Sequence, residues 1–185
     1  MTLEAYAKAR DGLRAEVIAH KKMRKVALGE HVTLLFEDEL TIRYQLQEIL
    51  RVEKIFEEPA ILEELAAYNP LVPDGNNWKA TMLIEYPDIA ERTRMLQQLK
   101  GIERQVWIEV AGSAKTYAIA DEDLQRENEE KTSAVHFLRF ELDTSKRQAL
   151  HNGAALEMGI DHPLYVARTR TTADTRRSLL KDFVG

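Results

Sequence analysis

The chain has 185 residues, a formal net charge of −5 and no cysteine. Its length suits a single domain, and 44% hydrophobic with 31% charged residues is the composition of a soluble globular protein. Without cysteine, disulfides, thiolate metal sites, iron–sulfur ligation and cysteine nucleophiles are excluded, and the negative charge argues against a nucleic-acid partner.

The first part of the chain, residues 1–70, reads as helices around one hairpin. Apolar periodicity and turn residues predict a helix at 3–22, a hairpin at 25–37, a helix at 40–56 and a helix at 59–68. The basic run H-K-K-M-R-K at 20–25 is interpreted as the solvated end of the first helix, because cations are favourable at a helix C-terminus. Asn69-Pro70 stops the last helix, and a loop follows.

The remainder shows one order of elements twice. The first unit has a strand at 78–86, a helix between the cap Asp88 and Gly101, and strands at 105–110 and 115–120. An acidic connection follows at 121–131. The second unit has a strand at 134–141, a helix starting near Asp143, strands at 155–160 and 164–169, and a final helix at 172–183.

This recurrence defines the predicted fold. Glu109 corresponds to Glu157 and Tyr117 to Tyr165 at one separation, and Met82 corresponds to His136 at another. We therefore predict a single α+β domain (1–185) with a mostly antiparallel sheet or a partly closed barrel. It is built from two β-α-β-β units at 78–120 and 133–183, after an N-terminal helix, a hairpin and a helix pair.

Two polar residues interrupt apolar patterns and become candidate catalytic residues. Glu53 lies within the apolar arc of the helix predicted at 40–56, and His136 lies on the core-directed face of its strand. Burial of a polar group without a partner costs roughly 1–3 kcal/mol, so the hypothesis is that Glu53 and His136 share one cavity. The alternative is that each lies at the end of its element and reaches solvent or a backbone amide.

A basic row on the opposite side of the same helix is a candidate binding surface. Arg43, Gln47 and Arg51 lie on successive turns, with Lys54 nearby. Guanidinium groups bind carboxylates and phosphates bidentately, so the row could hold an anion. A solvated helix face, or one paired with acidic residues elsewhere, is the alternative.

The sequence gives no local metal or phosphate motif. Asp161-His162-Pro163 contains residues that bind metals, but it lies between two strands and is typical of a turn. Histidine pairs with zinc or di-iron spacing and glycine-rich phosphate loops are absent from the sequence. A metal site formed by residues close in sequence is therefore not supported, a site assembled from distant residues stays open, and no particular cofactor is predicted.

Several blocks together carry a family resemblance: V-A-L-G-x-x-x-T-L-L-F-E, Y-Q-L-Q-E-I-L-R-V-E, Y-N-x-L-V-P, A-T-M-L-I-E, A-V-H-F-L-R-F and D-H-P-L-Y. Over nearly the whole chain they resemble the bacterial domain-of-unknown-function family numbered 3501. Carried onto this chain, the family pattern selects Gln47, Glu48, Arg51, Glu53, Asn69, His136 and His162. The resemblance implies a redox or peroxide-stress context, because genes of this family occur beside rubrerythrin-like and iron–sulfur oxidoreductase genes.

Three functions follow as hypotheses. The first is an accessory or binding protein in the cytoplasm that acts with a redox partner protein. A homodimer is one oligomeric state considered for it. The second is an enzyme in which Glu53 and His136 exchange protons and Arg51 holds an anionic substrate. The third is a metal-binding protein that uses His136, His162 and a carboxylate. No membrane segment is expected, since no apolar run approaches ~20 residues and the N-terminus lacks the apolar core of a signal peptide.

Overall fold

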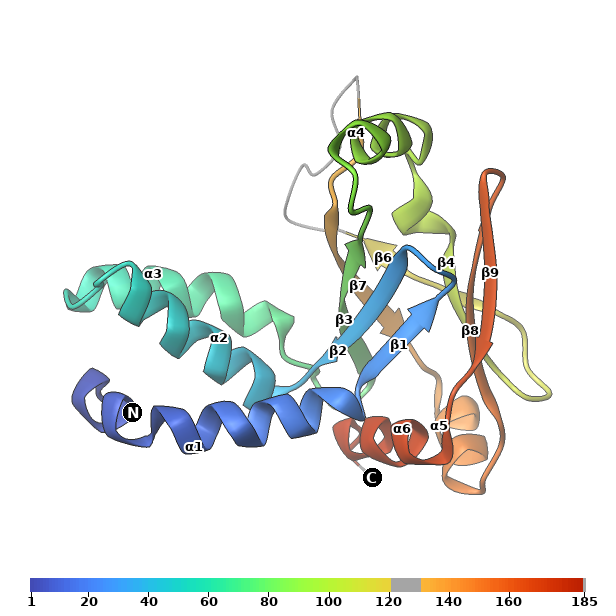
Figure 1. Cartoon of the computed structure of the whole chain (residues 1–185). Coiled ribbons are helices and arrows are strands. Elements are labelled where there is room, and N and C mark those ends of the chain that lie inside the picture. Colours follow the sequence, from blue (N-terminus) through green and yellow to red (C-terminus); the bar gives the residue numbers. More distant parts are fainter. Residues whose placement is uncertain (121–130, 185) are drawn as a thin grey trace.

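A helical arm projects from a β-sheet body in the computed structural model, which describes residues 1–120 and 131–184 (Figure 1). The arm contains α1 (Leu3–Lys22), α2 (Glu39–Val52) and α3 (Glu58–Tyr68). α2 contacts both other helices. The acidic connection predicted at 121–131 lies almost entirely outside the described residues. Within the described part of the chain, no helix combines the length and apolarity needed to cross a bilayer.

The body consists of two antiparallel sheets. The five-stranded sheet has the order β1-β2-β3-β7-β6, and the four-stranded sheet has the order β5-β4-β8-β9. The strands of the first are β1 (Lys25–Leu28), β2 (Val32–Glu37), β3 (Asn77–Ile84), β7 (Val135–Glu141) and β6 (Ile119–Ala120). Those of the second are β5 (Thr116–Tyr117), β4 (Val106–Val110), β8 (Leu156–His162) and β9 (Tyr165–Arg170). The predicted α+β fold is thus confirmed as two sheets, and the described strands form no closed barrel.

The two predicted units pair with each other strand by strand. β3 pairs with β7 so that Met82 lies opposite His136, and β4 pairs with β8 so that Glu109 lies opposite Glu157. The helices that follow β3 and β7 are α4 (Ile89–Gln98), which Asp88 caps, and α5 (Thr144–His151). Arg168 binds the carboxylates of both Glu109 and Glu157. The prediction that the two units are a repeat in the sequence stays a prediction.

The core lies between the two sheets, because alternate residues of both point inward. β3 confirms the strand predicted from residue 78, and its alternate residues Trp78, Ala80, Met82 and Ile84 are buried. The opposing sheet contributes a matching row of buried side chains: Val106, Ile108, Val110, Leu156, Met158 and Ile160. Burial on this scale is the main source of the stability of the body.

The last described segment closes one end of this core. It contains α6 (Ala173–Leu179) and the short 3-10 helix η3 (Leu180–Asp182), which lie below the sheets in Figure 1. The indole Nε1 of Trp78 donates a 2.9 Å hydrogen bond to the carbonyl of Leu179, and the Trp78 ring stacks on Phe183 at 5.0 Å between centroids. These contacts fix the position of η3. The other 3-10 helices are η1 (Asn69–Leu71) and η2 (Ile102–Gln105).

A buried carboxylate fastens the arm to the body. Glu37, at the end of β2, is 2% exposed. Its carboxylate accepts hydrogen bonds from Thr41 Oγ1 (2.5 Å) and Gln45 Nε2 (3.0 Å) of α2, and from Thr81 Oγ1 (2.7 Å) of β3. The next residue, Asp38, caps α2 through the amide of Thr41. The start of α2 is therefore held at the end of β2 by these hydrogen bonds.

The helix predicted at 40–56 is shorter than expected. α2 ends at Val52, Glu53 is its C-cap residue, and Lys54 adopts a positive φ of 55° that turns the chain away. Glu53 is consequently exposed, and Phe56 is 68% exposed. The apolar arc that was predicted to include both residues does not extend this far.

Candidate functional site

An open cleft lies where the start of the arm meets the C-terminal segment of the body. Its volume is about 400 Å³. The cleft is lined by Asp38, Glu39, Leu40, Arg43, Val72, Pro73, Lys181 and Asp182. We call it the Asp182 cleft. A volume of this size is in the range that accommodates small molecules.

The floor behind this cleft is organised by one buried guanidinium group. Arg24, between α1 and β1, is 1% exposed. It donates hydrogen bonds to the carbonyls of Phe36 (3.0 Å), Glu37 (3.0 Å) and Ser178 (3.2 Å). It also contacts two carboxylates of the cleft, Asp182 at 2.5 Å and Asp38 at 3.5 Å. One cation thereby joins the arm, the five-stranded sheet and the C-terminal segment.

Asp38 is the more strongly stabilised of the two carboxylates. Its Oδ1 accepts a 3.0 Å hydrogen bond from the amide of Thr41, and its Oδ2 lies 2.5 Å from His20 Nε2. Partial burial works to raise the pKa of Asp38, but the Thr41 amide, Arg24 and His20 together hold that pKa below its usual value. Asp38 is therefore an anion at neutral pH, with both oxygens engaged.

Asp182 has the opposite electrostatic character. Its side chain is 5% exposed, and burial raises its pKa to about 6, even though Arg24 favours the ionised form. The negative charge of nearby Asp38 acts in the same direction as burial. Arg24 occupies Oδ2 of Asp182, and no described residue donates to its other oxygen. A carboxyl group that titrates near neutral pH thus has one free oxygen at a cleft.

Charges of both signs border the mouth of the cleft. On the α2 side, Arg43 contacts Glu39 at 3.5 Å, and both side chains are more than half exposed. On the η3 side, Lys181 is exposed and forms no ion pair with any described residue. The third side, Val72 and Pro73, is apolar. Each charged side therefore offers one acid and one base.

The structure does not bring the predicted pair Glu53 and His136 into one cavity. Glu53 is exposed on the arm, whereas His136 is fully buried in β7. The imidazole Nε2 of His136 lies 2.9 Å from Thr132 Oγ1 and 3.0 Å from the carbonyl oxygen of Ser133. His136 faces inward as predicted. Both of these contacts come from residues just before β7, and not from Glu53.

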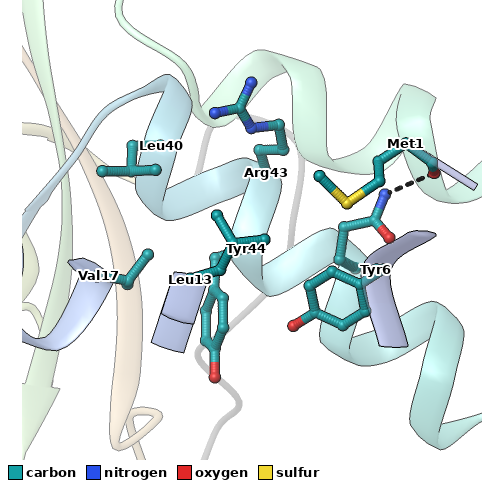
Figure 2. Close-up of a pocket in the computed structure, with 8 residues that line it drawn as sticks. Met1, Tyr6, Leu13, Val17, Leu40, Arg43 and Tyr44 are labelled. Atoms are coloured by element: carbon teal, nitrogen blue, oxygen red, sulfur yellow. Dashed lines mark hydrogen bonds between the residues drawn. The ribbon is translucent and has the colours of Figure 1, made fainter. Parts of the chain in front are cut away.

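The predicted basic row on α2 separates into different environments. Arg43 lines the Asp182 cleft, while Gln47 is buried against α1 and donates a 3.2 Å hydrogen bond to the carbonyl of Met1. Both residues line the small cavity between α1 and α2 that is drawn in Figure 2. Its volume of about 20 Å³ holds roughly one water molecule. The row therefore forms no continuous anion clamp.

Glu48 and Arg51, both selected by the family resemblance, belong to an ion-pair network that holds α1 on α2. The Glu48 carboxylate accepts two 2.8 Å hydrogen bonds from Arg10 and one of 2.6 Å from Tyr6. Arg51 adds a contact of 3.2 Å. The Arg10 bonds lower the pKa of Glu48 far below its usual range, although burial opposes them, with further lowering from Arg51 and Tyr6. The Arg10 and Tyr6 contacts with Glu48 join α1 to α2, and Arg51 pairs with the same carboxylate within α2.

The two remaining predicted residues lie at chain reversals. Asn69 is the exposed C-cap residue of α3. His162 is 7% exposed, its Nδ1 accepts from the amide of Leu164 (3.2 Å), and its Nε2 lies 3.3 Å from the carbonyl of Lys100. Because Nδ1 accepts, Nε2 carries the proton and the neutral ring has no free lone pair for a metal. Among the described residues, no three histidine or carboxylate side chains are arranged to hold a metal ion.

Sequence reasoning missed the residues that organise the cleft. The basic run at 20–25 indicates a solvated helix end, yet Arg24 within it is buried. A signal was present: Arg24, Val26 and Leu28 alternate with exposed Lys25 and Ala27, which places Arg24 on the inward face. No local signal identifies Asp182, because its partner is distant in the sequence.

Comparison with known proteins places the chain in a family. A model described as "Protein of unknown function (DUF3501)" matches residues 1–183. The crystal structure of a novel protein of unknown function from Burkholderia pseudomallei K96243 has a TM-score of 0.94 and 54% sequence identity, covering 100% of this chain and 96% of that chain. No curated protein matches this chain. Neither description mentions redox chemistry, a redox partner or a homodimer, so those expectations have no support. The match over residues 1–183 confirms the resemblance seen in the sequence: the chain belongs to the DUF3501 family.

Proposed function

We propose that the protein is a binding protein that holds a small zwitterion of the amino-acid class in the Asp182 cleft. The observation that carries this proposal is the distribution of charge around the cleft. Asp182 and Lys181 lie on one side, and Glu39 and Arg43 lie on the other. A ligand with both an ammonium and a carboxylate group can pair with both signs, whereas a simple cation or anion leaves one sign unmatched.

The free oxygen of Asp182 is the natural partner of the ammonium group. Asp38 already accepts from Thr41 and His20 and contacts Arg24, so its capacity is used within the protein. The Asp182 carboxylate has Arg24 on one oxygen only. Because its side chain is nearly fully shielded from water, an ammonium group bound there gains a strong charge-assisted hydrogen bond.

The two cations at the rim take the ligand carboxylate. Lys181 forms no ion pair with a described residue, and Arg43 shares only a 3.5 Å contact with exposed Glu39. Both can therefore turn toward a ligand at little cost. Val72, Pro73 and Leu40 supply apolar surface for an aliphatic side chain. The combination favours an amino acid with an apolar side chain over a purely polar one.

The test compares L-leucine with two analogues that each lack one charged group. Isothermal titration of the full chain with L-leucine, isoamylamine and 4-methylpentanoate measures the contribution of each charge. We expect L-leucine to bind at least ten-fold more tightly than either analogue. The variants Lys181→Ala and Arg43→Ala should each weaken L-leucine binding at least five-fold, and exposed Lys22→Ala serves as the matched control.

Two results oppose this function. If 4-methylpentanoate binds as tightly as L-leucine, the cleft is an anion site and the zwitterion is the wrong ligand class. If none of the twenty standard L-amino acids, titrated singly, produces a heat of binding or a shift in melting temperature, the cleft does not bind amino acids. Lys22→Ala must leave every measured value unchanged.

Acid–base catalysis is a second candidate function, and the titration of Asp182 favours it. A carboxyl group with a pKa raised to about 6 by burial, beside a cleft, is typical of proton-transfer sites. In this form of the enzyme hypothesis, Asp182 takes the role first given to Glu53. Incubation of a bound amino acid with the wild type and with Asp182→Asn, followed by NMR, tests it. Product in the wild type alone supports catalysis, and an unchanged ligand in both opposes it.

A further inference from the structure

The surface of α3 has an unusual composition for an exposed helix. Its sequence is E-P-A-I-L-E-E-L-A-A-Y, in which the only charged residues are three glutamates. A helix that is apolar on all sides is normally buried on all sides. Yet no residue of α3 is buried, and Figure 1 shows that the helix lies along the arm, outside the sheet body.

The helix has two apolar faces rather than one. Ala60, Ile61, Leu65 and Tyr68 are half-buried and form the side that packs within the arm. The exposed side carries Pro59, Leu62 and Ala66, at the i, i+3, i+7 spacing of a single helical stripe. Just before the helix, Phe56 is 68% exposed and adds a large apolar side chain to the exposed surface next to α3 in sequence. We call Phe56, Pro59, Leu62 and Ala66 the outer face of α3.

Carboxylates border the outer face, and no cation among the described residues pairs with them. Glu57, Glu58 and Glu63 are exposed, and none forms an ion pair with another described residue. The arrangement is an apolar stripe about 11 Å long from Pro59 to Ala66, with an acidic rim. Its chemical complement is an apolar stripe with a basic rim.

This charge pattern indicates which molecule covers the outer face: a second copy of the chain or a different protein. Two outer faces packed against each other would bring all six of these glutamates around one small interface. Like charges gathered in this way oppose association. A helix with lysine or arginine on either side of its apolar stripe relieves the same repulsion and covers the same apolar surface.

We propose that the outer face of α3 binds a basic amphipathic helix of a partner protein. The contact covers one short helix and is of the size found in transient complexes. Leu62, at the centre of the stripe, is 56% exposed and supplies the apolar anchor. Glu58 and Glu63 flank it and pair with the partner's cations.

The probe is a fluorescein-labelled 18-residue amphipathic peptide of leucine and lysine, and its counterpart has glutamate in place of lysine. Fluorescence anisotropy with the full-length chain should show saturable binding of the leucine–lysine peptide, weakened by added salt, and none of the leucine–glutamate peptide. Leu62→Ser should weaken binding at least ten-fold. The double variant Glu58→Lys/Glu63→Lys should weaken it by a similar factor.

Matched controls separate this face from general attraction to an acidic protein. Leu164→Ser removes an equally exposed leucine from the body, since Leu164 is 60% exposed. Glu16→Lys/Glu30→Lys changes two exposed acids elsewhere by the same net charge. Both controls should bind as the wild type does. If they weaken binding as much as the α3 variants, or if the leucine–glutamate peptide binds equally well, the proposal is wrong.

Light scattering with size-exclusion chromatography completes the test. We expect the wild-type chain to be monomeric, so that its outer face is free for the peptide. A dimer that dissociates in Leu62→Ser would overturn the proposal, because the outer face would then be covered by a second copy. All six positions substituted in these four variants are exposed, and unchanged circular dichroism confirms that each variant is folded.

Discussion

The guanidinium group of Arg24 donates a 2.5 Å hydrogen bond to the carboxylate of Asp182, and the two side chains are 1% and 5% exposed. A buried ion pair adds little stability over a well-packed apolar pair, but loss of one partner is costly. In this protein the cation also binds three carbonyl oxygens. Arg24 therefore determines whether the floor of the cleft can form.

Replacement of Arg24 should be strongly destabilising. Arg24→Met keeps most of the volume but leaves Asp182 and three carbonyls without their donor, so we expect a loss of about 3–5 kcal/mol in the free energy of unfolding. Urea unfolding followed by circular dichroism measures it. Arg177→Met is the control: its side chain is 71% exposed and pairs with Asp174 on the surface, and it should cost less than about 1 kcal/mol. Equal losses in the two variants would contradict the role of Arg24.

The titration of Asp182 should be visible in the pH dependence of stability. Its folded-state pKa of about 6 lies above the ordinary value of about 3.9, so the native state holds the proton more tightly than the unfolded chain. The resulting contribution to the free energy of unfolding is fully present below about pH 4 and is lost as the pH rises through 6. The loss amounts to about 3 kcal/mol. Asp182→Asn, which cannot ionise, should lack this loss.

The measurement is the difference in unfolding free energy between wild type and Asp182→Asn, from pH 4 to pH 7. Asp38, His20 and Arg24 face Asp182 and are present in both proteins, so their contributions to the free energy of unfolding largely cancel in the difference. The difference should move in favour of the variant as the pH rises. A constant difference, or a change of the opposite sign, is the contrary result.

Glu48→Gln should loosen the arm without unfolding the body. The substitution removes the charge that Arg10, Arg51 and Tyr6 share, and we expect a local loss of about 1–2 kcal/mol in the attachment of α1. Amides of α1 should then exchange about ten-fold faster or more, while strand amides keep their protection. Glu39→Gln, at an 80% exposed position, should leave the exchange of α1 unchanged.

Acid should have the same effect on the wild type as Glu48→Gln. The pKa of Glu48 is lowered by Arg10, so its contribution is present above the ordinary carboxyl pKa of about 4.3 and is lost as the pH falls below it. Exchange in α1, corrected for the intrinsic rate at each pH, should accelerate below about pH 4 in the wild type but not in Glu48→Gln. Equal acid sensitivity in both would show that other carboxyls control the arm.

The same substitution at two glycines should have opposite effects. Gly12 is exposed within α1 with no atom within 4 Å of an added methyl group, so Gly12→Ala should stabilise by about 0.5–1 kcal/mol. At Gly159, an added Cβ would lie 2.3 Å from the ring of Trp107 and 2.4 Å from the carbonyl of Ala167. Gly159→Ala should therefore destabilise by about 1–3 kcal/mol or more. Unfolding midpoints in urea distinguish the two signs.

Local signals in the sequence were sufficient to predict most of the body. Asp88 caps α4 through the amide of Glu91, and the alternation from Trp78 onward defines β3, both as predicted. Such features depend on residues close in sequence, where periodicity and capping act directly. The helical wheel failed at Glu53 because it assumed that the helix continued, whereas Lys54 leaves the helical conformation.

The cleft could be predicted much less well, because it depends on contacts between distant segments. Arg24 could have been identified as an inward residue by the alternation with Val26 and Leu28. Its pairing with Asp182 could not, since the two residues are 158 positions apart and no motif links them. The family resemblance also selected neither residue, although it was correct about the family.

That separation has a consequence for how the protein acquires its site during synthesis. Arg24 and Asp38 leave the ribosome early, but the wall formed by Lys181, Asp182 and the anchoring Phe183 follows more than a hundred residues later. Until then the guanidinium group lacks its closest carboxylate. The complete cleft therefore forms only once the polypeptide has been made and folded through residue 183.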